Sequence, residues 1–311
     1  MTDDLLAGRE RALRALELSV KRKLEGFLHG EITGLRTGPG SEPNEARPYQ
    51  AGQDDVRRMD WNVTARSLEA HVRAPLAERE LETWALLDAS ASMDFGTAAS
   101  EKRDLAIAIV GAVGLLADRP GNRLGIRIAL GDELRRLPAA GGAVQLRRSL
   151  RTLLSLPRAT PGAVPRTDLG RAISRFDREH TRPGLRVVVS DFHEDDWADP
   201  LRRLTARHEV IAVEVLDPRE LELPDVGLLT LVDPETGRRR EIQTANRKLR
   251  RRYADAMTAH RDRTARAIRA AGAAHLVLRT DQDWVRDVAA FTNARRRAGV
   301  RRHPTGRTGI R

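Results

Sequence analysis

The feature that most constrains the fold is a short apolar stretch that ends on a carboxylate, within the letters WALLDASASM of residues 84–93. It predicts a buried strand that delivers Asp88, Ser90 and Ser92 onto the loop at its carboxyl end. Ligands of open α/β sheets bind in the crevice beyond that end. One carboxylate and two hydroxyls are hard oxygen ligands, which suit Mg2+ or Mn2+ better than zinc. The same letters also fit a turn followed by a helix cap, so they need support from elsewhere in the chain.

Two later stretches give that support. Residues 187–191, VVVSD, form a second β-branched run that ends on a carboxylate, Asp191, as a parallel strand buried on both faces would. Thr167 stands just ahead of a helical pattern, where its hydroxyl could cap the helix, bind a metal or do both. In chain order, five residues resemble the metal-ion-dependent adhesion site of von Willebrand factor A domains: Asp88, Ser90, Ser92, Thr167 and Asp191.

The other apolar runs alternate between strand and helix patterns, which predicts an α/β fold with a doubly wound, mostly parallel sheet. Strands are expected at residues 123–130, 133–137, 209–216 and 274–278, and helices at residues 102–117, 144–156, 168 onward, 246–271 and 283–296. Gly131 and Asp132 separate the first two of those strands and predict a hairpin with one antiparallel edge strand. Asp195 and Asp196 are expected in the first turn of a further helix, where acids are favoured.

The chain divides into three expected parts. Residues 1–80 begin with an amphipathic helix at residues 3–28, whose apolar residues recur at helical spacing, and continue into an irregular region. Residues 81–297 form the α/β domain, with an inserted hairpin near residues 217–245 where prolines interrupt the alternation. Residues 298–311 are expected to be a basic, disordered tail.

Composition limits the classes of function. The chain has no cysteine, which excludes disulfides, thiolate zinc sites and thiol nucleophiles. Its net charge is +11, but residues 238–252 and 294–311 each carry +7, so the remainder is slightly acidic and nucleic acid is not an expected partner. The longest apolar run, residues 105–117, is shorter than the roughly 18 residues that indicate a membrane span. No leader pattern opens the chain, and we expect a soluble cytoplasmic protein.

A second candidate surface precedes the first strand of the domain. Between residues 49 and 66, arginines and aspartates alternate around two aromatic side chains. This pattern favours a specific contact surface over an ordinary solvated loop. The residues expected on that surface are Tyr49, Asp54, Asp55, Arg57, Arg58, Asp60 and Trp61.

The same segment carries a family resemblance. The letters YQAGQDDVRRMDWNVTAR of residues 49–66 and LLDASASMDFG of residues 86–96 resemble domain-of-unknown-function family 58. The similarity covers roughly residues 30–295, and its Asp-Asp-x-Arg-Arg-x-Asp-Trp motif is specific to the family. Gln53 is one residue more than the family usually has between the glycine and the first aspartate. Members of the family carry a von Willebrand factor A-like domain and are typically encoded beside MoxR-type AAA+ ATPases.

The resemblance implies a non-enzymatic adaptor that uses Mg2+ or Mn2+ to recognise proteins. Its partners would be a MoxR-type ATPase and a client that presents an acidic residue. By the same resemblance, the hydroxyls would bind the metal directly, while Asp88 and Asp191 would act partly through water. The chain has no Walker motif, so ATP hydrolysis would belong to the partner. Two alternatives stay open: a metal-dependent phosphoesterase that uses the same carboxylates with His193, and a nucleic-acid-binding module built on the basic helix and tail.

Overall fold

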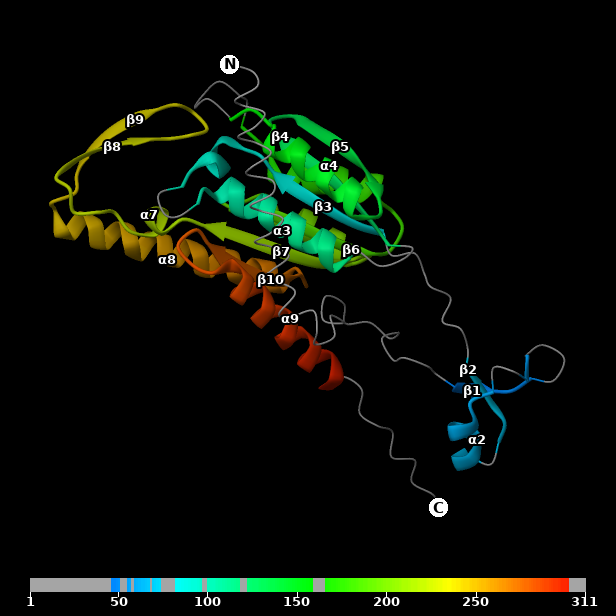
Figure 1. Cartoon of the computed structure of the whole chain (residues 1–311). Coiled ribbons are helices and arrows are strands. Elements are labelled where there is room, and N and C mark those ends of the chain that lie inside the picture. The colour runs from blue at the N-terminus through cyan, green and yellow to red at the C-terminus, as the bar shows by residue number, and fades with distance from the viewer. Residues whose placement is uncertain are drawn as a thin grey trace.

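The structure, a computed structural model, describes residues 46–50, 55–56, 59–67, 69–73, 82–96, 100–117, 122–158 and 166–301. The helix expected at residues 3–28 lies outside the described residues, as do Asp54, Arg57 and Arg58 of the charged segment. The described chain forms one large sheet flanked by helices, a projecting hairpin and a small amino-terminal unit (Figure 1).

The large sheet has six strands in the order β10-β7-β6-β3-β4-β5. Neighbouring strands are parallel except β4 and β5, which pair antiparallel at one edge. The predicted doubly wound, mostly parallel sheet with one antiparallel edge strand is confirmed. The strands are β3 (Glu82–Asp88), β4 (Arg123–Leu130), β5 (Glu133–Ala140), β6 (Leu185–Ser190), β7 (Glu209–Leu216) and β10 (Ala274–Arg279).

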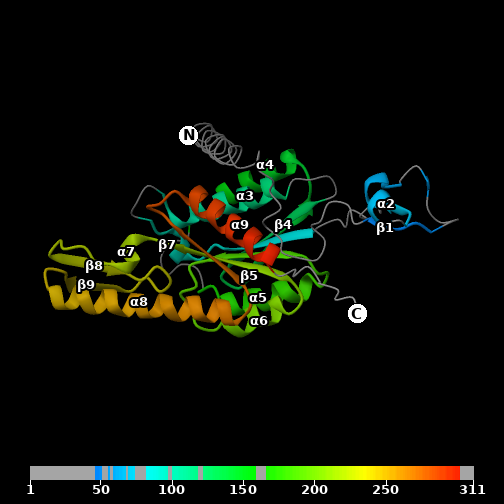
Figure 2. The ribbon, with the colours of Figure 1, turned by 90° about the horizontal axis from the view of Figure 1, so that it is seen from below.

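Helices cover both faces of this sheet, which is why its central strands are apolar on both sides. Along β3, Ala85 and Leu87 join the cluster under α3, α4 and α9, whereas Trp84 and Leu86 join the cluster under α5, α6 and α8. Figure 2 shows these two helical layers on opposite sides of the strands. The helices are α3 (Lys102–Leu116), α4 (Ala143–Leu154), α5 (Leu169–Glu179), α6 (Ala198–Thr205), α8 (Arg247–Ala270) and α9 (Trp284–Arg301).

The position of the candidate site follows from the pairing of β3 with β6. These strands are parallel neighbours, with Leu87 opposite Val189. Both therefore end at the same edge of the sheet, and the residues that follow Leu87 and Val189 lie beside one another. This pairing brings Asp88 and Asp191, far apart in the sequence, to one place.

Two smaller units accompany the domain. Between β7 and α8 the chain forms the short helix α7 (Pro218–Leu221) and an antiparallel hairpin of β8 (Leu228–Val232) and β9 (Arg239–Gln243), within the range predicted for the insertion. Ahead of the domain, β1 (Ala46–Pro48) and β2 (His71–Arg73) pair antiparallel, with α2 (Trp61–Ser67) between them in sequence.

Three local predictions were wrong. Asp168 caps α5, and its carboxylate accepts the N–H of Arg171 at 2.7 Å, so Thr167 is not the capping residue. Asp195 and Asp196 precede α6, which begins at Ala198, because the turn before that helix is longer than the acidic pattern suggested. Helix α9 continues through Arg301, past the boundary of the predicted tail at residue 297, since arginine and alanine favour helix.

No helix in the described part of the chain has the length and apolar character needed to cross a membrane.

Candidate metal centre

The centre of the candidate site is a buried carboxylate at the end of β3. Asp88 is 6% exposed; one of its oxygens accepts the N–H of Ser90 at 2.9 Å, and the other accepts the hydroxyl of Ser190 at 2.6 Å. Burial, followed by the charge of Asp191, raises the pKa of Asp88 to about 6, although both hydrogen bonds lower it in part. The described residues form no salt bridge to Asp88. A cation beside it would therefore relieve an uncompensated buried charge.

Two serine side chains lie beside Asp88 and Asp191. Ser90 directly precedes the 3-10 turn η2 (Ala91–Asp94), which holds Ser92, and the two hydroxyl oxygens lie 3.1 Å apart. The Ser92 side chain lies close enough to Asp191 to help lower the pKa of that carboxyl. The structure thus brings four of the five predicted residues into one cluster of carboxylate and hydroxyl oxygens, the kind of donor set that hard divalent cations prefer.

The fifth predicted residue has a different neighbour. Thr167 is buried just before α5, and its hydroxyl oxygen accepts the backbone N–H of Gly131 at 2.9 Å. Among the hydrogen bonds of the described residues, none joins Thr167 to the two aspartates or the two serines. Its membership of the metal centre stays a prediction.

Asp191 already has a cationic partner. The ammonium of Lys102, at the start of α3, lies 2.8 Å from Asp191 Oδ2 and 2.5 Å from Glu220 Oε1, and Lys102 is fully buried. Burial raises the pKa of Asp191, but the charges of Lys102 and then His193 outweigh it and hold that pKa below its ordinary value. Asp88 and Asp191 thus have opposite pKa shifts, because only Asp191 contacts this ammonium.

A second set of potential ligands lies around that ammonium. Asp191, His193 and Glu220 each offer one atom, and these atoms lie within 4.8 Å of one another. His193 Nδ1 is 4.0 Å from Asp191 Oδ1, and its Nε2 is 3.9 Å from Glu220 Oε1. A metal bound there would compete with Lys102 for the same two carboxylates. Asp88 forms no salt bridge with an ammonium among the described residues, so the side of the centre around Asp88 suits a divalent cation better.

Three neighbours of the site were not predicted from the sequence: Lys102, Glu220 and Glu235. Glu235 lies in the turn between β8 and β9 and accepts the backbone N–H of Ser92 at 3.0 Å. The sequence did hold an indication for Lys102, because a lysine at the first position of a helix is unfavourable with the helix dipole and therefore suggests a specific partner. A signal also existed for Glu220, which follows β7 at the same edge of the sheet.

The charged segment of the amino-terminal unit is in part structural. Asp60 is buried, and its carboxylate accepts the N–H groups of Asn62 and Val63 at the start of α2. The backbone of Tyr49 is bonded to that of Ala70. Trp61 is 67% exposed, as a contact surface would require. Asp55 is exposed too, and whether the segment binds a partner stays a prediction.

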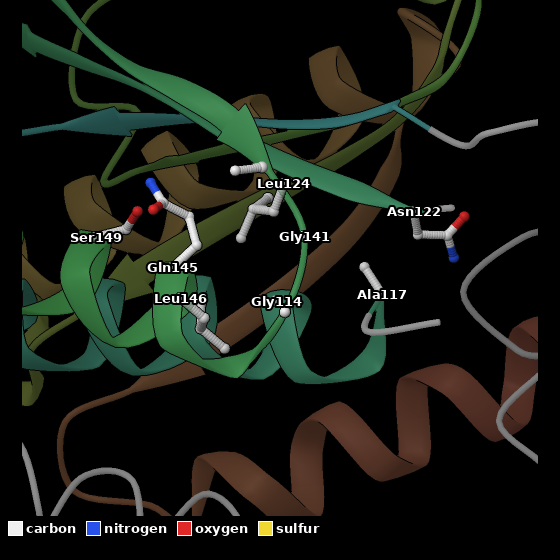
Figure 3. A pocket seen from close by; sticks show the side chains of 10 residues that line it. Gly114, Ala117, Asn122, Leu124, Gly141, Gln145, Leu146 and Ser149 are labelled. Carbon is white, nitrogen blue, oxygen red and sulfur yellow. The ribbon is translucent and has the colours of Figure 1, made fainter. Parts of the chain in front are cut away.

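A small cleft lies away from this centre (Figure 3). It is lined by Gly114 and Ala117 at the end of α3, Leu124 at the start of β4, and Leu146 of α4. These residues lie at the amino ends of the parallel strands, whereas Asp88 lies at a carboxyl end. The cleft therefore does not belong to the candidate metal centre.

Comparison with known proteins shows the family. The family model "Protein of unknown function DUF58" matches residues 45–263. The uncharacterized proteins Mb1516 of Mycobacterium bovis and Rv1480 of Mycobacterium tuberculosis are each 52% identical over 293 residues, which cover 94% of this chain and 91% of theirs. A solved structure of the conserved hypothetical protein BatB from Bacteroides thetaiotaomicron aligns with 70% of this chain and 99% of its own at 16% identity, with a TM-score of 0.42. By the family match and the mycobacterial relatives, the chain belongs to the DUF58 family of proteins of unknown function.

Proposed function

We propose that this protein is a metal-dependent protein-recognition module, in which Asp88, Ser90, Ser92 and Asp191 hold Mg2+ or Mn2+. The observation that carries the proposal is the buried Asp88 carboxylate, which has hydrogen-bond donors but no salt bridge among the described residues. Burying a charge without a counter-charge is unfavourable, and a binding site can retain such a charge for the ligand it serves.

The donor set supports a hard divalent cation. Two carboxylates and two hydroxyls provide only oxygen, and Mg2+ keeps some of its water because it dehydrates reluctantly. The bound ion would offer an exchangeable position to a carboxylate from another protein. Thr167 would join the site if its hydroxyl turned from Gly131, as the family resemblance implies.

The proposal assigns the site to binding without catalysis. The two serine hydroxyls lie within hydrogen-bond distance of each other, and each carboxylate accepts a backbone N–H group, which supports a role as fixed ligands. His193, the candidate base of a phosphoesterase, faces the two carboxylates that share the Lys102 ammonium. The partners that we propose, on the family resemblance alone, are a MoxR-type AAA+ ATPase and a client that presents an acidic residue.

The metal is tested by calorimetric titration of the purified chain with Mg2+. Wild type should bind one ion, and Asp88→Asn should abolish that binding. The matched control is Asp132→Asn, which removes a carboxylate whose side chain is 72% exposed on the β4–β5 turn, and it should bind as wild type does. Equal binding by Asp88→Asn and wild type would refute the assignment of Asp88.

The recognition is tested by capture from the native cell extract. Immobilised wild type, Asp88→Asn and Asp132→Asn are compared in Mg2+ and in EDTA, and retained proteins are identified by mass spectrometry. An ATPase or client retained only by wild type and Asp132→Asn, and only with Mg2+, is the expected result. Retention of the same proteins by all three variants in EDTA would overturn metal-dependent recognition.

A further inference from the structure

The β8–β9 hairpin delivers a carboxylate to the metal centre from a distant part of the chain. Glu235 Oε1 accepts the N–H of Ser92 at 3.0 Å, although the two residues are 143 positions apart. Figure 1 shows the hairpin arching over α7 and α8 toward the domain. A side chain that reaches this loop from an inserted element is not needed to fold the sheet, so its placement calls for another explanation.

The turn that carries Glu235 is fixed by its own hydrogen bonds. Asp233 Oδ1 accepts the N–H groups of Glu235 at 2.9 Å and Thr236 at 3.3 Å, and the Thr236 hydroxyl donates to Asp233 Oδ2. Gly237 closes the turn with a φ of 67°, in the left-handed region that favours glycine. These hydrogen bonds therefore fix the backbone that carries Glu235.

The surroundings of Glu235 are unfavourable for a carboxylate on its own. Its side chain is half-buried, and the nearby carboxylates of Asp191 and Glu194 repel it. Arg166 offsets part of this repulsion, but its guanidinium pairs with Glu194. The described residues form no salt bridge to Glu235. A divalent cation between Glu235 and the carboxylates of the centre would turn this repulsion into attraction.

We propose that Glu235 is a metal ligand that the chain supplies to its own centre, and that in the free protein it holds the position taken by a partner's acidic residue in the complex. This inference rests on the proposed function. Glu235 would then set the affinity that a partner must exceed in order to bind. No residue of β8 or β9 belongs to either core cluster of the described residues, so moving the hairpin would uncover little apolar surface.

The test uses Mn2+ alone as the probe, with electron paramagnetic resonance for affinity and water-proton relaxation for the number of waters on the bound ion. In Glu235→Ala, the affinity should fall several-fold and the bound Mn2+ should gain one exchangeable water. Added acetate, a stand-in for a partner's carboxylate, should then remove that water in Glu235→Ala but not in wild type. Glu241→Gln is the matched control, because it removes an exposed acid from the same hairpin and should behave as wild type.

The outcomes separate this inference from the proposed function. If wild type binds Mn2+ through Asp88, and Glu235→Ala binds it with the same affinity and hydration, Glu235 is not a ligand and only the inference falls. If wild type does not bind Mn2+, or if Asp88→Asn binds it equally well, both the proposed function and this inference are refuted. Glu235→Gln keeps the length of the side chain and removes its charge, so it controls for local changes caused by truncation. Its affinity for Mn2+ should lie between those of wild type and Glu235→Ala.

Discussion

Replacing Asp88 with asparagine should stabilise the metal-free protein. Asp88 has an ordinary pKa of 3.8 and a pKa of about 6 in the folded chain, mainly because it is buried. At about 1.4 kcal/mol for each unit of pKa, the ionised carboxylate costs the folded state about 3 kcal/mol at pH 7. Asparagine keeps an acceptor for the Ser90 N–H and places an amide near Ser190, whose hydroxyl can turn to accept. We therefore expect the free energy of unfolding to rise by about 1–3 kcal/mol in EDTA, allowing for imperfect bonds.

The sign of the pH dependence follows from the raised pKa. Between pH 3.8 and about 6, the folded state binds a proton that the unfolded state does not, so the penalty on the carboxylate is full above about pH 6 and is relieved as the pH falls. The advantage of Asp88→Asn over wild type should be smaller by about 1 kcal/mol at pH 5 than at pH 7, and its pH-dependent part should vanish below about pH 4. Comparing the two proteins at each pH cancels the titration of all other groups.

Urea unfolding at pH 7 and pH 5, in EDTA and in Mg2+, measures these differences. Mg2+ at about 100 times its dissociation constant should stabilise wild type by about 2.7 kcal/mol and leave Asp88→Asn unchanged. If Asp88 served only as a turn and cap, asparagine would serve about as well, so the substitution would leave the stability nearly unchanged with or without metal. An Asp88→Asn that is no more stable than wild type in EDTA would refute the reasoning.

Three further predictions concern stability. Lys102→Met should cost about 3–5 kcal/mol in urea unfolding, because the buried Asp191 and the partly buried Glu220 lose their shared ammonium. A cost below about 1 kcal/mol would contradict those ion pairs. Burial, and then nearby arginines, lowers the pKa of His180 to about 3 and that of His208 to about 4. The free energy of unfolding should therefore fall as the pH drops from 6.5 toward 4, by up to about 1.4 kcal/mol per pH unit for each histidine. His208→Gln should flatten that slope in urea titrations, and an unchanged slope would exclude His208 as a cause. Gly125→Ala should cost about 1–3 kcal/mol in thermal unfolding, since the added Cβ would lie 2.5 Å from the ring of Trp84, and unchanged stability would show that the ring moves freely.

The strands that build the site could be read from the sequence because each is a short apolar run that stops at an acid. Asp88 and Asp191 both end such runs, and in a parallel sheet strand ends converge at one edge. The serines after Asp88 could be read for the same reason, since residues two positions apart follow the same strand into the loop. Local pattern and sheet geometry were together sufficient for this part of the centre.

The contacts that complete the centre could not be predicted in the same way. Lys102 is 89 positions from Asp191, and Glu235 is 143 positions from Ser92. The letters around Glu235 predict a turn, but they do not specify the loop that the turn approaches. For Thr167 the sequence predicted a metal ligand, because this residue stands just ahead of a helix. In the structure its hydroxyl instead accepts a backbone N–H of the β4–β5 turn. Contacts of this kind depend on how loops fold over the sheet, which periodicity does not encode.

The measurement that tests the metal centre most directly is the anomalous scattering of Mn2+ in crystals of the chain soaked with that ion. The account predicts one strong peak bounded by Asp88, Ser90, Ser92 and Asp191, with the Lys102 ammonium still on Asp191 and Glu220. A peak among Asp191, His193 and Glu220 with Lys102 displaced would contradict it, as would the lack of any peak at this edge of the sheet at saturating Mn2+.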